Sequence, residues 1–139
     1  MKILILLNLF MSSYVYSTVI PHPQEIKIGK KAVTGILKIS GNQHYLISKK
    51  IQTIPQIKLT ENGAWNFRIQ IKKPLNSYPV FRTDESYELR ANKKEVLLLS
   101  ENEYGALHGL ETMRQLLIDF EGKLPEVVIK VLDCSAGFC

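Results

Sequence analysis

The stretch "SENEYGALHGLETMRQLL", residues 100–117, decides the fold because it predicts one amphipathic helix. Its apolar residues recur at spacings of four and three, which places them on one helical face wide enough to cover a sheet. Together with one residue just beyond the stretch they are Ala106, Leu110, Met113, Leu117 and Phe120. We therefore expect the rest of the chain to pack around this helix.

Sequence signals also mark the ends of the helix. Ser100 and Glu103 form an S-x-x-E capping box, which predicts the start by satisfying the first free N–H groups. Gly122 stands where a C-terminal cap is expected, and Pro125 prevents the helix from continuing.

Two glycines, Gly105 and Gly109, lie one turn apart inside this helix. Each costs about 1 kcal/mol relative to alanine in a helix interior. The cost is explained if another backbone must approach the helix closely. Two interpretations remain open: the helix packs on this domain's own sheet, or a neighbouring domain packs on the helix.

Strands are predicted on both sides of the helix. In "AWNFRIQIKK", residues 64–73, Trp65 and every second residue to Ile71 are apolar, which places them on one sheet face. Residues 86–99 predict a hairpin, and residues 126–132 predict a last strand. Three further short strands are predicted at residues 25–28, 32–40 and 43–48. Gly29 predicts a turn, and residues 51–60 are ambiguous because Pro55 breaks a long element.

Strands, one long helix and a final strand predict an α+β fold, an antiparallel sheet with the helix packed on one face. One helix covers only part of a sheet. We therefore expect the domain to bury a further surface against something else.

The composition indicates one globular domain without a nucleic-acid partner. The 139 residues include 18 Lys plus Arg against 13 Asp plus Glu, a net charge of +5. The lysines occur as scattered pairs, without the stripe and aromatic interleaving of a nucleic-acid face.

The first 17 residues predict a signal peptide. Lys2 precedes an apolar run at residues 3–11, and small residues near Ser17 suit a peptidase. The run is shorter than the about 20 residues of a membrane span. A signal anchor is the alternative. After removal of the signal we expect no membrane span, and a secreted or lumenal product.

No catalytic, cofactor or metal site is predicted. Cys134 and Cys139 permit a small disulfide loop but make a poor zinc site, which usually needs four ligands. The adjacent carboxylates Asp84 and Glu85 stand at the entrance to a strand, where a charged strand-edge pair is expected. The three histidines, His22, His44 and His108, show no spacing that indicates catalysis or metal binding.

The run from Asp84 to Leu117 resembles the N-terminal domain of β-N-acetylhexosaminidases of glycoside hydrolase family 20, the chitobiase-like enzymes. That domain has an E-x-Y-x-L strand, a turn, a second strand and a helix reading G-x-x-x-G-x-x-T-x-x-Q-L-L. The matching residues are Glu85, Tyr87, Leu89, Gly105, Gly109, Leu110, Thr112, Arg114, Gln115, Leu116 and Leu117. "VIPHPQEIKI", residues 19–28, is similar to the family's first strand, whereas residues 40–80 match poorly.

The resemblance implies an accessory domain that leans on a catalytic (β/α)8 barrel. In the family the substrate's own acetamido group attacks the anomeric carbon, assisted by an Asp–Glu pair on the barrel. A barrel takes about 250 residues, so this chain is expected to hold the accessory domain and none of the catalytic one. Gly105, Gly109, Arg114 and Gln115 are the residues expected to pack on the barrel.

The chain departs from the family in two places. Gly41 to Gly63 is short and contains Pro55, so a helix that many members have there is expected to be lost or reduced. The family continues after the last strand with D-x-P-R-F-x-W-R-G, but "LDCSAGFC" retains only Asp133. We therefore expect a signal peptide at residues 1–17, the domain at 18–133 and a divergent tail at 134–139. A fragment, a splice form and a short protein all remain open.

Three functions follow. The first is a non-catalytic accessory domain of a hexosaminidase that packs on a barrel. The alternative is a stand-alone secreted module that binds a glycan or a protein, with Trp65, Tyr78 and Tyr87 as candidate stacking residues. A small enzyme in its own right is the third, and the chain alone is expected to be inactive.

Overall fold

Seven strands and two helices make up the described part of the protein in the computed structural model, which comprises residues 24–33, 36–40, 44–60, 66–75, 77–80 and 83–132. In chain order they are β1 (Glu25–Val33), β2 (Leu37–Ser40), α1 (Tyr45–Gln52), β3 (Ile57–Thr60), β4 (Phe67–Ile71), β5 (Tyr87–Ala91), β6 (Val96–Ser100), α2 (Glu103–Asp119) and β7 (Leu124–Val131). The signal peptide, Trp65, Cys134 and Cys139 lie outside the described residues.

The main sheet has the strand order β1-β7-β5-β6-β4. The predicted hairpin is confirmed as β5 and β6, which pair antiparallel, and β7 pairs antiparallel with both β5 and β1. The α+β class is confirmed, but the sheet is mixed because β4 pairs parallel with β6. After β4 the chain crosses over the position of β6 to form β5, and only then returns as β6. Strand β4 is therefore at the edge of the sheet and runs parallel to its neighbour β6.

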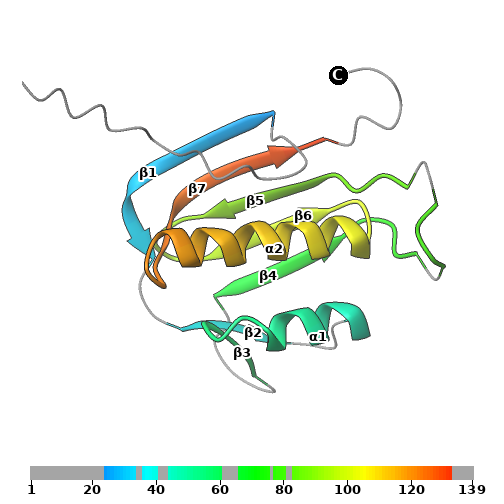
Figure 1. Ribbon diagram of the computed structural model, residues 1–139, viewed down its shortest axis with the longest axis horizontal. Coiled ribbons are helices and arrows are strands. Elements are labelled where there is room, and N and C mark those ends of the chain that lie inside the picture. The colour runs from blue at the N-terminus through cyan, green and yellow to red at the C-terminus, as the bar shows by residue number, and fades with distance from the viewer. Residues whose placement is uncertain are drawn as a thin grey trace, which may run out of the picture.

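The long helix α2 lies across β5 and β6 on one side of the sheet (Figure 1). Its predicted apolar face is confirmed, because Ala106, Leu110 and Met113 are fully buried and Leu117 is nearly so. Phe120 is the exception. It follows the last helical turn as the C-cap and is 38% exposed.

The predicted capping box is wrong, whereas the predicted C-terminal cap is confirmed. Ser100 is still part of β6, and the N-cap is Asn102, whose side-chain oxygen accepts from the N–H groups of Tyr104 and Gly105. At the other end the Gly122 N–H donates to the Leu117 carbonyl at 2.6 Å. Gly122 has a φ of +81°, a conformation that glycine adopts without strain.

The predicted strand at residues 43–48 is wrong, because these residues lead into the helix α1. Ile47, Ile51 and Ile54 recur at spacings of four and three and are all buried, so the helical period overrides the local alternation. A helix of 8 residues is thus present in this part of the chain. It packs beside a separate parallel pair formed by β2 and β3.

The predicted turn at Gly29 is also wrong, since β1 runs through this position. Its register against β7 shifts between Ile28 and Ala32, as at a β-bulge. A Cβ built on Gly29 would lie 3.0 Å from the Cβ of Glu126. Glycine therefore allows close approach of the two strands here and does not end the strand.

Candidate functional site

Gly105 and Gly109 lie on the buried side of α2, against strands of this domain. A Cβ built on Gly105 would lie 2.6 Å from the carbonyl oxygen of Ser86, which belongs to the backbone. One built on Gly109 would overlap the side chain of Leu98 and lie 3.1 Å from Cδ2 of Tyr87. Packing on the domain's own sheet thus accounts for both glycines. Packing of another domain near them stays a prediction.

The start of α2 is tied to the connection between β4 and β5. Glu103 is buried, and its carboxylate accepts from the backbone N–H of Leu75 at 2.7 Å. The hydroxyl of Tyr104 donates to the carbonyl of Ser77 at 3.0 Å. Sequence reasoning missed this role of Glu103, because it assigned the residue to a capping box with Ser100.

Tyr87 and Thr112, both part of the matched motif, meet in the core beneath α2. Their hydroxyl oxygens lie 2.5 Å apart, in a buried hydrogen bond between β5 and the helix. Burial raises the pKa of the Tyr87 phenol. Because Tyr87 is only 3% exposed, it is no stacking surface for a ligand, and its proposed role as one is wrong.

Arg114 lies on the flank of α2 that faces α1 and pairs with Glu111. Its guanidinium donates to both carboxylate oxygens of Glu111, at 2.5–3.0 Å. Lys50 of α1 donates to the same carboxylate. The hydrogen bond from Arg114, followed by that from Lys50, lowers the pKa of Glu111 to about 2, although burial opposes the shift. This cluster joins the two helices.

Gln115 is half-buried on the outward part of α2. Its side-chain oxygen is buried, yet no described residue donates a hydrogen bond to it. A buried acceptor without a partner costs free energy.

Asp84 and Glu85, the adjacent carboxylates, have separate partners. Asp84 accepts from the backbone N–H of Ser86 at 2.9 Å, and Glu85 lies 2.8 Å from Nε2 of His108 on α2. Asp84 thus stabilises the backbone just before β5, and Glu85 joins this segment to α2. Both roles are structural. His44 stands at the N-cap position of α1.

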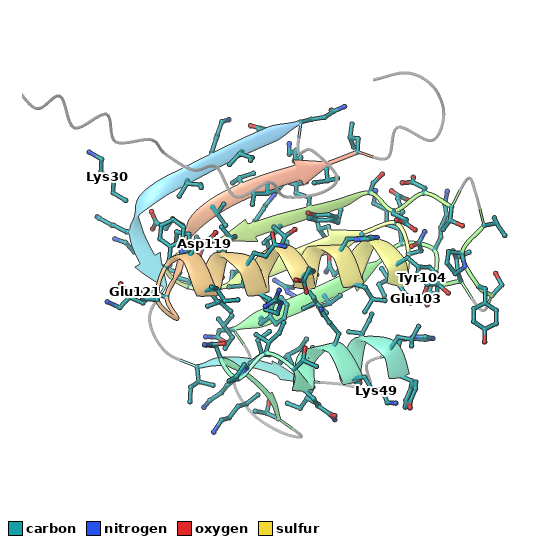
Figure 2. All side chains as sticks on the ribbon, viewed as in Figure 1. Lys30, Lys49, Glu103, Tyr104, Asp119 and Glu121 are labelled. Carbon is teal, nitrogen blue, oxygen red and sulfur yellow. The ribbon has the colours of Figure 1, made fainter. Side chains whose placement is uncertain are left out.

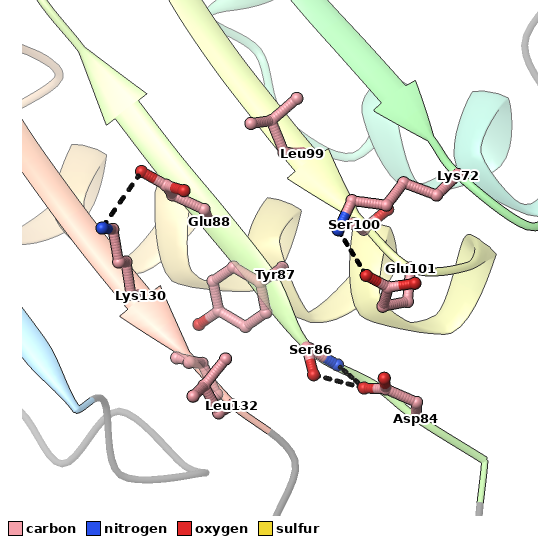
Figure 3. Close-up of a pocket in the computed structure, with 11 residues that line it drawn as sticks. Lys72, Asp84, Ser86, Tyr87, Glu88, Leu99, Ser100, Glu101, Lys130 and Leu132 are labelled. Atoms are coloured by element: carbon pink, nitrogen blue, oxygen red, sulfur yellow. Dashed lines mark hydrogen bonds and ion pairs between the residues drawn. The ribbon is translucent and has the colours of Figure 1, made fainter.

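A shallow pocket of about 260 Å³ lies on the side of the sheet away from the helices (Figure 3). Leu99 and Leu132 provide its apolar part. Its charged rim is internally paired, because Lys72 contacts Glu101 at 2.5 Å and Lys130 lies 4.0 Å from Glu88. Asp84 also lines the pocket and accepts from the backbone N–H and the hydroxyl of Ser86, so most of the charged groups at the rim have a partner within the protein.

A second hollow of about 370 Å³ lies near the starts of both helices, where Figure 2 shows Tyr104. It is lined by His44, Leu75, Ser77, Tyr78 and Tyr104, and we call it the aromatic hollow. Tyr78 is 90% exposed.

Within the described ranges, no three His, Cys, Asp or Glu side chains gather as metal ligands. The helices of those ranges, α1 and α2, lack the length and apolar character needed to span a membrane.

Comparison with known proteins matches this arrangement to one family. A family model described as "beta-acetyl hexosaminidase like" matches residues 43–116, more than half of the chain. Three solved structures share the fold at low sequence identity, and each is several times longer than the part of it that this chain covers.

The first is a β-N-acetylhexosaminidase from Bacteroides fragilis, with a TM-score of 0.56 and 14% identity over 81% of this chain and 24% of the enzyme. A chitobiase from Flavobacterium johnsoniae matches with a TM-score of 0.55 and 21% sequence identity, over 79% of this chain and 20% of the enzyme. An N-acetyl-β-hexosaminidase from Streptomyces plicatus matches with a TM-score of 0.52 and 19% sequence identity, over 81% of this chain and 25% of the enzyme. The chain thus spans a fifth to a quarter of these enzymes, and it belongs to the β-acetyl-hexosaminidase-like family, glycoside hydrolase family 20.

Proposed function

We propose that the chain is a non-catalytic N-terminal domain of a β-N-acetylhexosaminidase-like glycoside hydrolase and acts structurally by packing on a catalytic barrel. The parent activity is removal of terminal N-acetylhexosamine from glycans. One observation carries the proposal: the fold accounts for about four fifths of this chain but only 20–25% of each matched enzyme. The domain therefore corresponds to one part of those proteins, and the remaining part is what it would pack against.

The open face of the main sheet has the character of a solvent face. Strands β1, β4, β5 and β7 carry charged side chains on this face that pair with one another, whereas β6 presents Leu97 and Leu99 there. The pairs are Arg68–Glu95 at 3.0 Å, Lys130–Glu25 at 3.5 Å, Lys27–Glu25 at 2.6 Å and Arg90–Glu88. Burying these pairs against another domain would cost the hydration of every charge. This argues against docking through the open face.

The helical side instead exposes large apolar side chains. Ile118 on α2 is 61% exposed, and on α1 Tyr45 is 64% and Leu46 is 38% exposed. A concentration of such side chains on one side marks an interaction surface. We therefore assign the catalytic domain to the helical side.

Strand β1 extends this surface beyond the edge of α2. Ile26 pairs with Ile129 and Ile28 pairs with Val127, so all four side chains point to the helical side. Ile129 and Val127 are buried beneath α2, whereas Ile26 and Ile28 are 44% and 49% exposed. Figure 1 shows why, since α2 does not reach over β1. Another domain would cover this strip.

Two residues expected to pack on the barrel fit this assignment. Gln115 is half-buried on α2, so part of its side chain is available to a neighbouring domain. Arg114 keeps part of its side chain exposed, at 37%, while bound to Glu111. Gly105 and Gly109 contribute indirectly, because they set the depth at which α2 lies on the sheet.

The same proposal assigns the remaining parts of the chain. Residues 1–17 act as a signal peptide, residues 18–133 form the domain, and residues 134–139 are a divergent tail. The product is then secreted or lumenal, as the export signal requires.

The transcript beyond codon 139 tests the proposal. We expect an in-frame catalytic domain, and the longer product should release a chromogenic N-acetylglucosamine while this chain alone does not. Hydrolysis by the purified chain would overturn the proposal. So would an authentic stop codon after Cys139 together with a chain that is monomeric and binds no hydrophobic dye.

A further inference from the structure

We propose that the aromatic hollow binds one or two sugar units of a neutral glycan. The site comprises His44 at the start of α1, Tyr104 in the first turn of α2, and Leu75, Ser77 and Tyr78 from the connection between β4 and β5. This inference goes beyond the packing function and does not depend on it, because the site is complete within this chain.

The lining combines aromatic faces with a few polar groups, as small-molecule sites do. Tyrosine rings offer rigid apolar faces, and their hydroxyls offer hydrogen bonds at the edge. Tyr78 exposes nearly its whole side chain, at 90%. A pyranose ring has a complementary character, since one of its faces is made of C–H groups and its rim of hydroxyls.

Charge narrows the class of ligand. Among the described residues that line the hollow there is no Lys, Arg, Asp or Glu. The polar groups are the phenols of the tyrosines, the hydroxyl of Ser77 and the ring nitrogens of His44, which donate and accept without a fixed charge when the imidazole is neutral. The lining therefore favours an uncharged polyhydroxylated ligand over a phosphate, a nucleic acid or an acidic peptide.

Hydrogen bonds hold the walls of the hollow in place. The Tyr104 hydroxyl donates to the Ser77 carbonyl, and the Glu103 carboxylate holds the N–H of Leu75. A site that is already ordered loses less entropy on binding.

The volume limits the length of the occupant. At about 370 Å³ the hollow is near the lower end of the range for ligand pockets, about 300–1,000 Å³. It suits one or two pyranose rings, with the rest of a glycan chain outside.

The test is an NMR titration of the ¹⁵N-labelled full-length chain with chitotriose and, in a second arm, with cellotriose. We expect shifts confined to residues around Tyr78 and Tyr104, with saturation below about 10 mM. A response to chitotriose alone would assign the acetamido group as part of the recognised ligand, and equal responses would assign the pyranose ring. Absence of shifts with both sugars would overturn the proposal.

Two variants test whether the sugar binds at the aromatic hollow. Tyr78→Ala removes an exposed ring and should weaken binding about tenfold without loss of folding. Tyr45→Ala is the matched control, because Tyr45 is exposed and contacts Lys49 but does not line the hollow. Unchanged binding by Tyr78→Ala, or an equal loss in both variants, would contradict the assignment. Failure of sugar binding leaves the packing function untouched, since that function is read from the transcript and from hydrolysis.

Discussion

The two helices lie on the same side of the protein but are held in different ways (Figure 1). α2 has 17 residues, an Asn102 cap that accepts two N–H groups, and glycines that bring its backbone onto β5 and β6. α1 has 8 residues, and His44 at its N-cap position makes no side-chain cap. Backbone contact and capping thus stabilise α2, whereas α1 depends on a few buried isoleucines and on its contact with α2.

This difference indicates an order of stability within one domain. Short helices are marginal by themselves and depend on tertiary packing. We therefore expect α1 with β2 and β3 to open before the main sheet, and α2 to be the element whose damage unfolds the whole domain.

The largest expected effect comes from Gly105→Ala. The new Cβ would meet the Ser86 carbonyl, and a backbone atom cannot turn away as a side chain can. We expect a loss of about 2–4 kcal/mol in the free energy of unfolding, even after the gain of about 1 kcal/mol in helix propensity.

Urea denaturation of the full-length chain measures this loss. Ile118→Ala is the matched control in the same helix, because Ile118 is 61% exposed, and it should change stability by less than about 0.5 kcal/mol. Gly109→Ala should fall between the two, since the side chain of Leu98 can give way. Wild-type stability in Gly105→Ala would show that α2 does not lie where the packing places it.

Asn102→Ala is the next variant in order of effect. It removes the acceptor for the N–H groups of Tyr104 and Gly105, so we expect a loss of about 1–2 kcal/mol in thermal or urea denaturation. Ser100→Ala removes the residue that the sequence had assigned to the capping box and serves as the comparison. Because the Ser100 hydroxyl donates to the Asn102 carbonyl at 2.9 Å, Ser100→Ala also loses a buried hydrogen bond, so the decisive result is that of Asn102→Ala: wild-type stability in that variant would contradict its role as the cap.

His44→Asp tests α1 by adding a cap, whereas the preceding variants remove stabilising features of α2. An aspartate at this position can accept from the first free N–H groups of α1 and lies at the positive end of its dipole. We expect a gain of up to about 1 kcal/mol, seen as slower amide exchange in α1. Slower exchange throughout the main sheet but not in α1 would contradict the separate stabilities of the two regions.

The smallest effect concerns the Glu111 cluster that joins the helices. Because its pKa in the folded chain is lowered from 4.5 to about 2, the ionised form stabilises the fold. That contribution is fully present above about pH 4.5 and is lost as the pH falls towards 2. Glu111 is about one-third exposed, so we expect it to be worth less than about 1 kcal/mol.

Denaturation midpoints at pH 7 and pH 3 measure the contribution, with Glu111→Gln as the comparison. The variant should lose stability at pH 7 and show a smaller change between the two pH values than the wild type does. The same pH dependence in both proteins would exclude Glu111 as its source.

The main sheet and α2 could be predicted because their signals are local. Trp65 to Ile71 alternates with a period of two, residues 86–99 combine strand patterns with a turn, and the apolar residues from Ala106 to Phe120 repeat over about four helical turns. α1 was missed because it is short, and an alternating segment around residue 45 hid the spacing of Ile47, Ile51 and Ile54. The cap was assigned to Ser100 because a sequence does not show whether a strand has ended.

The candidate surfaces could be predicted only in part. Gly105 and Gly109 predicted that another part of the protein lies close to the helix backbone. Only the fold shows that these neighbours are Ser86 and Leu98. The aromatic hollow joins residues 44, 75, 77, 78 and 104, which come from three separate parts of the sequence and meet through tertiary structure. Tyr78 and Tyr87 look alike as sequence, yet one is 90% and the other 3% exposed.

The most direct measurement for the packing function compares Ile118→Arg on the helical side with Gln70→Arg on the open face of β4, in the complete product of the transcript. The readout is the temperature at which half of the hexosaminidase activity is lost. We predict a clear decrease for Ile118→Arg, because an arginine would be buried without a partner at the docking surface, and no change for Gln70→Arg. Equal temperatures for the two variants, or a decrease only in Gln70→Arg, would contradict docking through the helices.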